Sequence, residues 1–189
     1  MDFTEAVDKA PPGWRHFTTD DIARLPASVR RHEMARVPPG ETPDRILKFL
    51  FWTLVYHLAP EMWDELASFE PIHPDLLDAL PARASTALDV GAGSGRLTQH
   101  LVARSRRVIA VEPSSGLLSA LTRRLPEVRG VEGWAEALPI RSGTAELTAV
   151  CGAFGPDPAI LSELKRVTAP GGLIVMVSPE QPEWFDANG

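Results

Sequence analysis

The sequence predicts an α/β fold in which a mostly parallel sheet is flanked by helices. Short apolar stretches, typical of buried strands, alternate with stretches whose apolar residues recur at helical spacing. The first such strand, residues 85–90, leads into three glycines at alternate positions and then into a helical pattern. A strand, a glycine turn and a helix form the unit that holds nucleotide-like ligands in parallel sheets, because glycine allows a sharp turn and close ligand approach.

Composition narrows the class of protein. The 189 residues suffice for one domain with an appendage, and the net charge of −6 weighs against nucleic acid as a partner. Cys151 is the single cysteine, so an internal disulfide is excluded and a reducing, cytoplasmic location is expected. The acidic N-terminus has no signal-peptide pattern.

Residues 1–82 predict an irregular arm followed by a helical lid. The clearest helix starts at Thr42-Pro43, with threonine as N-cap and proline in the first turn. Its apolar run to residue 58 is shorter than the roughly 20 residues that cross a bilayer, so we expect no membrane span. Further short helices are expected at 27–37, 61–69 and 74–80.

The spacing of the glycines indicates which class of nucleotide-like ligand the loop binds. Gly91, Gly93 and Gly95 form G-x-G-x-G, and Arg96 stands where a dinucleotide fingerprint has its third glycine or alanine. Asp89, two positions ahead of the glycines, suits an ammonium group better than a pyrophosphate. The stretch resembles motif I of the class I S-adenosylmethionine (SAM) dependent methyltransferases. The resemblance implies a Rossmann-like fold, SAM as cofactor with S-adenosylhomocysteine as product, and cofactor contacts from the acid and the loop: Asp89, Gly91, Ala92, Gly93 and Gly95.

The second predicted strand, 107–112, ends in an acid. Glu112 lies where a carboxylate can accept both ribose hydroxyls of the cofactor, and Pro113 follows it. The alternative is that Glu112 only caps the next helix, 114–125.

A third strand, 128–131, precedes Gly133–Pro139, a loop that resembles the family's Gly-Asp-Ala-Glu-x-Leu-Pro segment. Trp134 replaces the aspartate that binds the adenine amino group in the family. Adenine recognition is then left to backbone groups or Glu136, with Trp134 and Ala135 beside the base, and looser adenine selectivity or weaker binding is expected.

The fourth strand, 146–151, ends at Cys151, which the resemblance places near the cofactor. A catalytic thiolate is not expected, because no base is visible near it. A helix from Asp157-Pro158 then leads to Pro170-Gly171-Gly172, which matches the family's Pro-Gly-Gly turn, and to a fifth strand, 173–177.

The family's sheet normally continues with a sixth and a seventh strand, and this sequence shows only a polar tail, 179–189. The fifth strand is therefore expected to be an uncovered edge. Three explanations stay open: a truncated chain, a homodimer or partner chain over 173–177, or cover by the N-terminal helices.

The predicted organisation is an arm and lid (1–82), a SAM-binding core (83–178) and a tail (179–189). The predicted activity is methyl transfer to a small-molecule acceptor, mainly by proximity and orientation, without a metal. The residues expected around the acceptor are Tyr56, His57, Trp63 and Phe154, with His57 the only candidate base. The alternative is a catalytically degenerate SAM-binding or scaffold protein that acts through a partner chain, whereas Arg96 disfavours an NAD dehydrogenase.

Overall fold

The computed structural model describes residues 16–154 and 157–177. The chain divides into two compact units, residues 1–66 and 67–189. The predicted division of the chain at residue 83 stays a prediction, and the tail 179–189 lies outside the described residues. No helix of the described part is long and apolar enough to cross a membrane.

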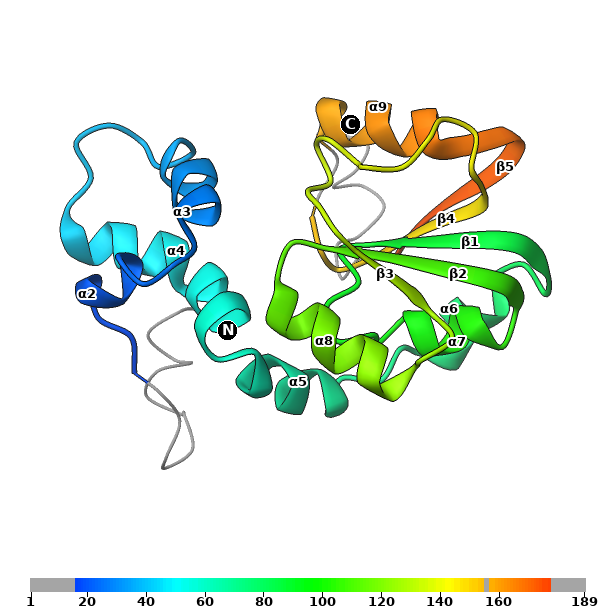
Figure 1. Ribbon diagram of the computed structural model, residues 1–189, viewed down its shortest axis with the longest axis horizontal. Helices are drawn as coiled ribbons and strands as arrows, with labels where there is room; N and C mark the ends of the chain where they lie inside the picture. Colours follow the sequence, from blue (N-terminus) through cyan, green and yellow to red (C-terminus); the bar gives the residue numbers. More distant parts are fainter. Residues whose placement is uncertain (1–15, 155–156, 178–189) are drawn as a thin grey trace. The chain divides into compact units, whose positions relative to one another are not determined.

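Helices make up the described part of the first unit (Figure 1). The predicted start of the longest helix is confirmed, because Thr42 accepts a hydrogen bond from the Arg45 backbone N–H and Pro43 is the first helical residue. One side of this helix is buried through Leu50 and Leu54. The helices are α2 (Thr19–Ile22), α3 (Ala27–Met34), α4 (Pro43–Leu58) and α5 (Pro60–Ser68), the last of which reaches the boundary with the second unit.

The second unit contains the predicted parallel sheet of five strands, in the order β3-β2-β1-β4-β5 (Figure 1). The strand order reverses between β1 and β4, and ligands of doubly wound sheets bind at the carboxyl ends of the strands at such a point. The elements are α6 (Pro74–Asp78), β1 (Ala84–Val90), α7 (Thr98–Val102), β2 (Ser105–Glu112), α8 (Ser115–Arg124), β3 (Arg129–Glu132), β4 (Ala145–Cys151), α9 (Pro158–Val167) and β5 (Thr168–Val177).

The two faces of the sheet have separate hydrophobic cores, since successive strand residues point to opposite faces. Ala87 and Ala110 share one cluster with Leu101 of α7 and Leu121 of α8. On the other face, β-strand side chains pack against α9, which Figure 1 shows on the opposite side of the sheet from α8. Asp89 and Glu112 continue the alternation of Ala87 and Ala110, so their side chains belong to the α7 and α8 face.

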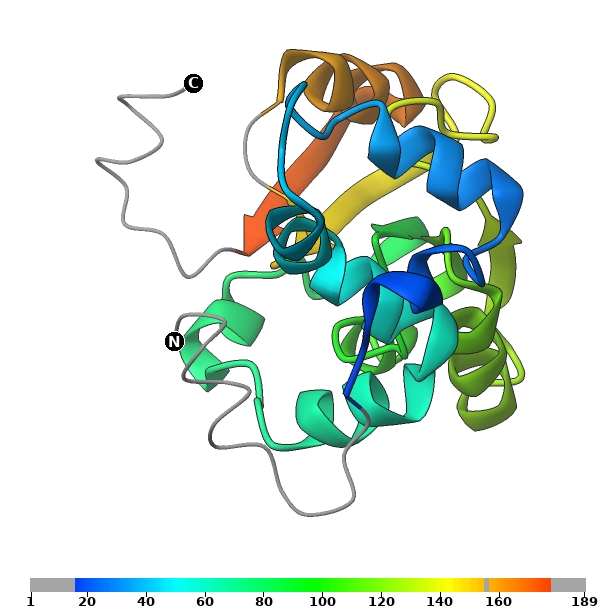
Figure 2. The same ribbon diagram turned by 90° about the vertical axis from the view of Figure 1, so that its left-hand side faces the viewer.

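The predicted start of the fifth strand is wrong, whereas the other four strands begin within two residues of their predicted starts. β5 begins at Thr168, directly after α9, and runs beside β4 (Figure 2). Its pairing with β4 shifts between Ala145, opposite Thr168, and Leu147, opposite Leu173. The Pro-Gly-Gly segment is thus an irregularity inside the strand, because pairing with β4 resumes on both sides of it. β5 is the last strand at its end of the described sheet, and Leu173 is 46% exposed.

Candidate functional site

The loop after β1 has a backbone that requires glycine. Gly91, Gly93 and Gly95 have φ angles of 69°, 55° and 102°. A Cβ on Gly91 would lie 2.5 Å from the Ala153 Cβ, and one on Gly95 would lie 3.1 Å from Leu121 Cγ of α8. The loop therefore packs tightly between the end of β4 and α8, which fixes its backbone at the carboxyl edge of β1.

Asp89 is a buried carboxylate with one free oxygen. Its side chain is 1% exposed, and Oδ2 accepts a hydrogen bond of 2.6 Å from the Thr98 hydroxyl at the start of α7. Oδ1 has no hydrogen-bond partner; the other such buried side-chain atom in the described residues is Ser105 Oγ. Burial raises the pKa of Asp89 from 3.8 to about 6, although the Thr98 hydrogen bond works in the opposite direction.

Glu112 is held by two backbone groups. Oε2 accepts from the Gly93 N–H at 2.9 Å, and Oε1 accepts from the Ser114 N–H at 2.9 Å. Burial raises the pKa of Glu112 to about 7, the two N–H groups lower it, and the Asp89 carboxyl raises it. The N-cap of α8 is Ser114, whose hydroxyl accepts from the Leu117 N–H. Glu112 therefore ties the glycine loop to the start of α8 and does not itself serve as the N-cap.

The strand register brings three functional side chains to one edge. Asp89 pairs with Ala110 of β2 and with Ala149 of β4, and Glu112 and Cys151 each lie two residues further along these strands. Two residues span about 6.6 Å and return to the same face of the sheet. The acid of β1 is thus flanked by the acid of β2 and the thiol of β4.

Arg96 lies beside Cys151 at this edge. Its Nη2 is 3.6 Å from the Cys151 Sγ, and its Nη1 donates to the Glu70 carboxylate at 2.9 Å and to the Glu70 carbonyl oxygen at 3.3 Å. Burial raises the pKa of the Cys151 thiol, and the Arg96 guanidinium only partly offsets this. Burial therefore disfavours the thiolate form of Cys151.

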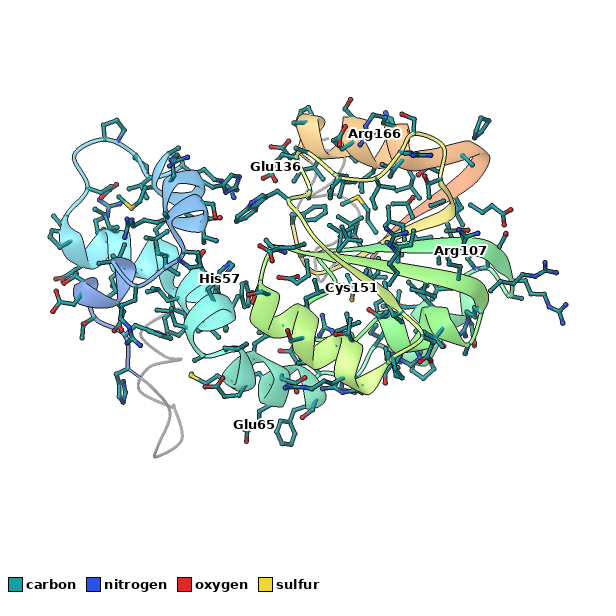
Figure 3. The ribbon with its side chains drawn as sticks, in the orientation of Figure 1. His57, Glu65, Arg107, Glu136, Cys151 and Arg166 are labelled. Carbon is teal, nitrogen blue, oxygen red and sulfur yellow. The ribbon has the colours of Figure 1, made fainter. Side chains whose placement is uncertain are left out.

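The loop after β3 carries Trp134, Ala135 and Glu136, all half-buried, and Figure 3 labels Glu136 and Arg166 of α9. Further along the same loop, the Leu138 N–H donates to Glu163 at 2.7 Å, and Arg166 donates to the Leu138 carbonyl oxygen at 2.9 Å. The same arginine donates to the Ile140 carbonyl oxygen at 2.7 Å. This clamp fixes the loop to α9, and sequence reasoning did not foresee it.

The residues expected around an acceptor lie in both units of the chain. Tyr56, His57 and Trp63 belong to the first unit, and the Tyr56 and Trp63 rings are 5.1 Å apart in an edge-to-face contact. Phe154 belongs to the second unit, where its Cε1 lies 3.6 Å from the position of a Cβ on Gly91. Burial lowers the pKa of His57 to about 4, so its imidazole is neutral at pH 7.

In the described part of the chain, no three His, Cys, Asp or Glu side chains form a group that could hold a metal ion.

Comparison with known proteins agrees with this fold. Residues 87–172 match the family described as a methyltransferase domain. An uncharacterized methyltransferase of Mycobacterium tuberculosis is 38% identical over 107 residues, which cover 55% of this chain and 44% of that protein. A demethylmenaquinone methyltransferase of Beutenbergia cavernae is 35% identical over 112 residues, which cover 57% of this chain and 47% of that protein. The chain spans about half the length of these curated relatives.

Two solved structures share the fold. A proposed SAM-dependent methyltransferase of Methanococcus maripaludis superposes with a TM-score of 0.57 at 20% identity, covering 70% of this chain and 68% of that one. A TehB-like SAM-dependent methyltransferase of Corynebacterium glutamicum gives a TM-score of 0.51 at 23% identity, covering 61% and 68%. Residues 87–172 therefore resemble a methyltransferase domain, and these solved structures share the fold of the chain.

Proposed function

We propose that this chain binds SAM and transfers its methyl group to a small-molecule acceptor. The observation that carries the proposal is Asp89 Oδ1, a buried carboxylate oxygen without a partner beside a glycine loop. A buried charge without a partner is costly, so a cationic donor is the expected occupant. The ammonium group at the amino-acid end of SAM has the required charge and the N–H donors.

Glu112 fits the ribose of the same ligand. Each of its carboxylate oxygens already accepts one backbone N–H, which fixes the orientation of the group. A carboxylate oxygen can accept two hydrogen bonds, so one site on each oxygen remains for the two ribose hydroxyls. The loop of Trp134, Ala135 and Glu136 would border the adenine, together with Pro113.

SAM supplies a methyl group on a sulfonium that is already activated for transfer. The chain's own part is to fix the ligand, through Asp89 and Glu112, with Phe154 beside the acceptor. His57 is not assigned a base role, because a general base works best with a pKa near the operating pH and burial lowers that of His57 to about 4.

Two observations support a small-molecule acceptor. The net charge of −6 does not favour a nucleic-acid substrate. A relative with 35% identity is named for a small acceptor, demethylmenaquinone.

Calorimetric titration with SAM and S-adenosylhomocysteine tests the cofactor site. We expect wild-type affinities on the order of micromolar, in the range usual for enzyme substrates. Glu112→Ala should weaken binding about 10- to 100-fold, because hydrogen bonds to a charged acceptor are lost. Glu132→Ala is the matched control: Glu132 pairs with Glu112 in the sheet register but is exposed, so binding should be unchanged. A folded protein that binds neither ligand would refute the proposal.

Transfer of the methyl group is tested separately with SAM that carries a radiolabelled methyl group. The label should appear in a low-molecular-mass cell fraction and not in protein or nucleic acid. Binding without any labelled product would instead support the degenerate SAM-binding alternative.

We also propose a cytoplasmic location and a second copy or partner chain that pairs with the exposed edge of β5. Light scattering of wild type and of Val175→Pro, which disrupts backbone pairing along β5, tests this association. A wild-type protein that is monomeric at all concentrations would refute the pairing with a second copy.

A further inference from the structure

We infer that Arg96 binds the carboxylate at the amino-acid end of SAM, and that the Glu70 carboxylate competes for the same guanidinium. The inference rests on the proposed function, because it assumes that SAM occupies the edge of β1. It adds a second charged contact to the amino-acid end of the ligand, opposite in sign to that of Asp89.

The position of Arg96 is the first support. It directly follows Gly95 in the glycine loop, and its side chain is only 23% exposed. The 3.6 Å contact with the Cys151 Sγ holds its Nη2 over the end of β4, the strand that lies next to β1. The guanidinium therefore lies at the reversal of strand order, where doubly wound folds bind their ligands.

The second support is that charges of both signs act on Cys151. Arg96 lowers the pKa of the thiol, and Asp89 raises it. Cys151 therefore lies within electrostatic reach of a cation and of a buried anion whose Oδ1 has no partner. An amino acid carries an ammonium and a carboxylate on one carbon, so a site with Asp89 and Arg96 both near Cys151 matches a zwitterion in both charges.

The partners that Arg96 has in the structure are exchangeable. The Glu70 side chain is 62% exposed and lies outside the helices, and exposed ion pairs contribute little stability. A thiol sulfur is a weak acceptor. A ligand carboxylate held by the two-pronged guanidinium would replace both contacts with stronger, charge-assisted bonds.

The test uses two ligands that differ in one group: SAM and decarboxylated SAM, which keeps the ammonium and the sulfonium but lacks the carboxylate. Arg96→Met should weaken SAM binding about 10- to 100-fold and leave the affinity for decarboxylated SAM within twofold of wild type. Glu70→Gln should strengthen SAM binding by about 2- to 5-fold, with no change for decarboxylated SAM.

Two further variants separate charge from structure. Arg96→Lys keeps the charge without the two-pronged geometry, so an intermediate loss specific to SAM is expected. Arg107→Met is the matched control, because Arg107 lies on the exposed first half of β2 (Figure 3), and both affinities should stay at the wild-type level.

The outcomes distinguish this inference from the proposed function. If Arg96→Met weakens both ligands equally, Arg96 has a structural role in the loop and the inference is wrong. If it changes neither ligand while wild type binds both, the inference is wrong and the SAM site stands. If wild-type protein binds neither ligand, the proposed function fails and the inference fails with it.

Discussion

The hydrogen bond from Thr98 to Asp89 makes a prediction that depends on pH. Thr98 is 0% exposed, and its hydroxyl donates to the carboxylate at 2.6 Å. Thr98→Val removes the donor while nearly preserving the shape of the side chain. At pH 8 Asp89 is ionised, so the lost bond is charge-assisted and its removal should cost about 1.5–3 kcal/mol of unfolding free energy. At pH 5, below the folded-state pKa of about 6, Asp89 is mostly neutral, and the cost should fall to about 0.5–1.5 kcal/mol.

Urea unfolding at the two pH values measures this difference. Thr148→Val is the matched control, because Thr148 is also 0% exposed but its hydroxyl pairs with the neutral Thr168 hydroxyl at 2.7 Å. Its cost should be the same at pH 5 and pH 8. Thr98→Ser, which keeps the hydroxyl, should show no pH dependence either. An equal cost of Thr98→Val at both pH values would mean that the hydroxyl does not stabilise the ionised form of Asp89.

Three further predictions concern the acids and the glycine loop. Burial raises the pKa values of Asp89 and Glu112 in the folded chain. Between about pH 4 and pH 7, the folded chain therefore holds protons on these two acids that the unfolded chain has released. The free energy of unfolding should then fall as pH rises through this interval. Asp89 alone should contribute a loss of about 3 kcal/mol across this interval, seen as a steeper decline of unfolding free energy in wild type than in Asp89→Asn. Asp89→Asn should therefore unfold at a higher urea concentration than wild type at pH 8 but bind no SAM; a variant that binds SAM normally would exclude Asp89 from the site. In thermal unfolding, Gly91→Ala should destabilise the fold by more than Gly171→Ala. Both positions have positive φ, but only at Gly91 does the new Cβ meet another atom, the Ala153 Cβ at 2.5 Å.

Local sequence patterns were sufficient to predict the central sheet. Apolar runs that alternate with helical spacing predict five strands. Parallel order follows where a helix connects two strands, but β3 and β4 are connected without one. The start of β5 was misplaced because Pro170-Gly171-Gly172 has the composition of a turn. Pairing with β4 outweighs that local preference, since Thr168 is held by Leu164 O at 2.6 Å and by the Thr148 hydroxyl at 2.7 Å.

Some residues of the candidate site have a local signal in the sequence, and others have none. Asp89 and Glu112 can be found from the sequence because Asp89 is next to the last residue of β1, Glu112 is the last residue of β2, and both lie at a fixed distance from the glycines. Thr98 also has a local signal, a hydroxyl residue at the start of the helix after the loop, and it was missed because that position is usually assigned to capping. Glu70 has no such signal: it contacts Arg96 across 26 residues of chain from an irregular segment, and no spacing rule connects the two.

The two acids and the loop form one electrostatic unit. Gly93 donates to Glu112, Thr98 donates to Asp89, and the Asp89 charge raises the pKa of Glu112. Ionising both carboxyls at once is unfavourable in this buried place, because the described residues provide hydrogen bonds but no cation in contact with either acid. A ligand with one ammonium and two hydroxyl donors would supply the missing positive charge to Asp89 and the missing donors to Glu112. Binding would then favour the ionised state of both acids, so SAM affinity should rise with pH through the interval in which the free protein loses stability.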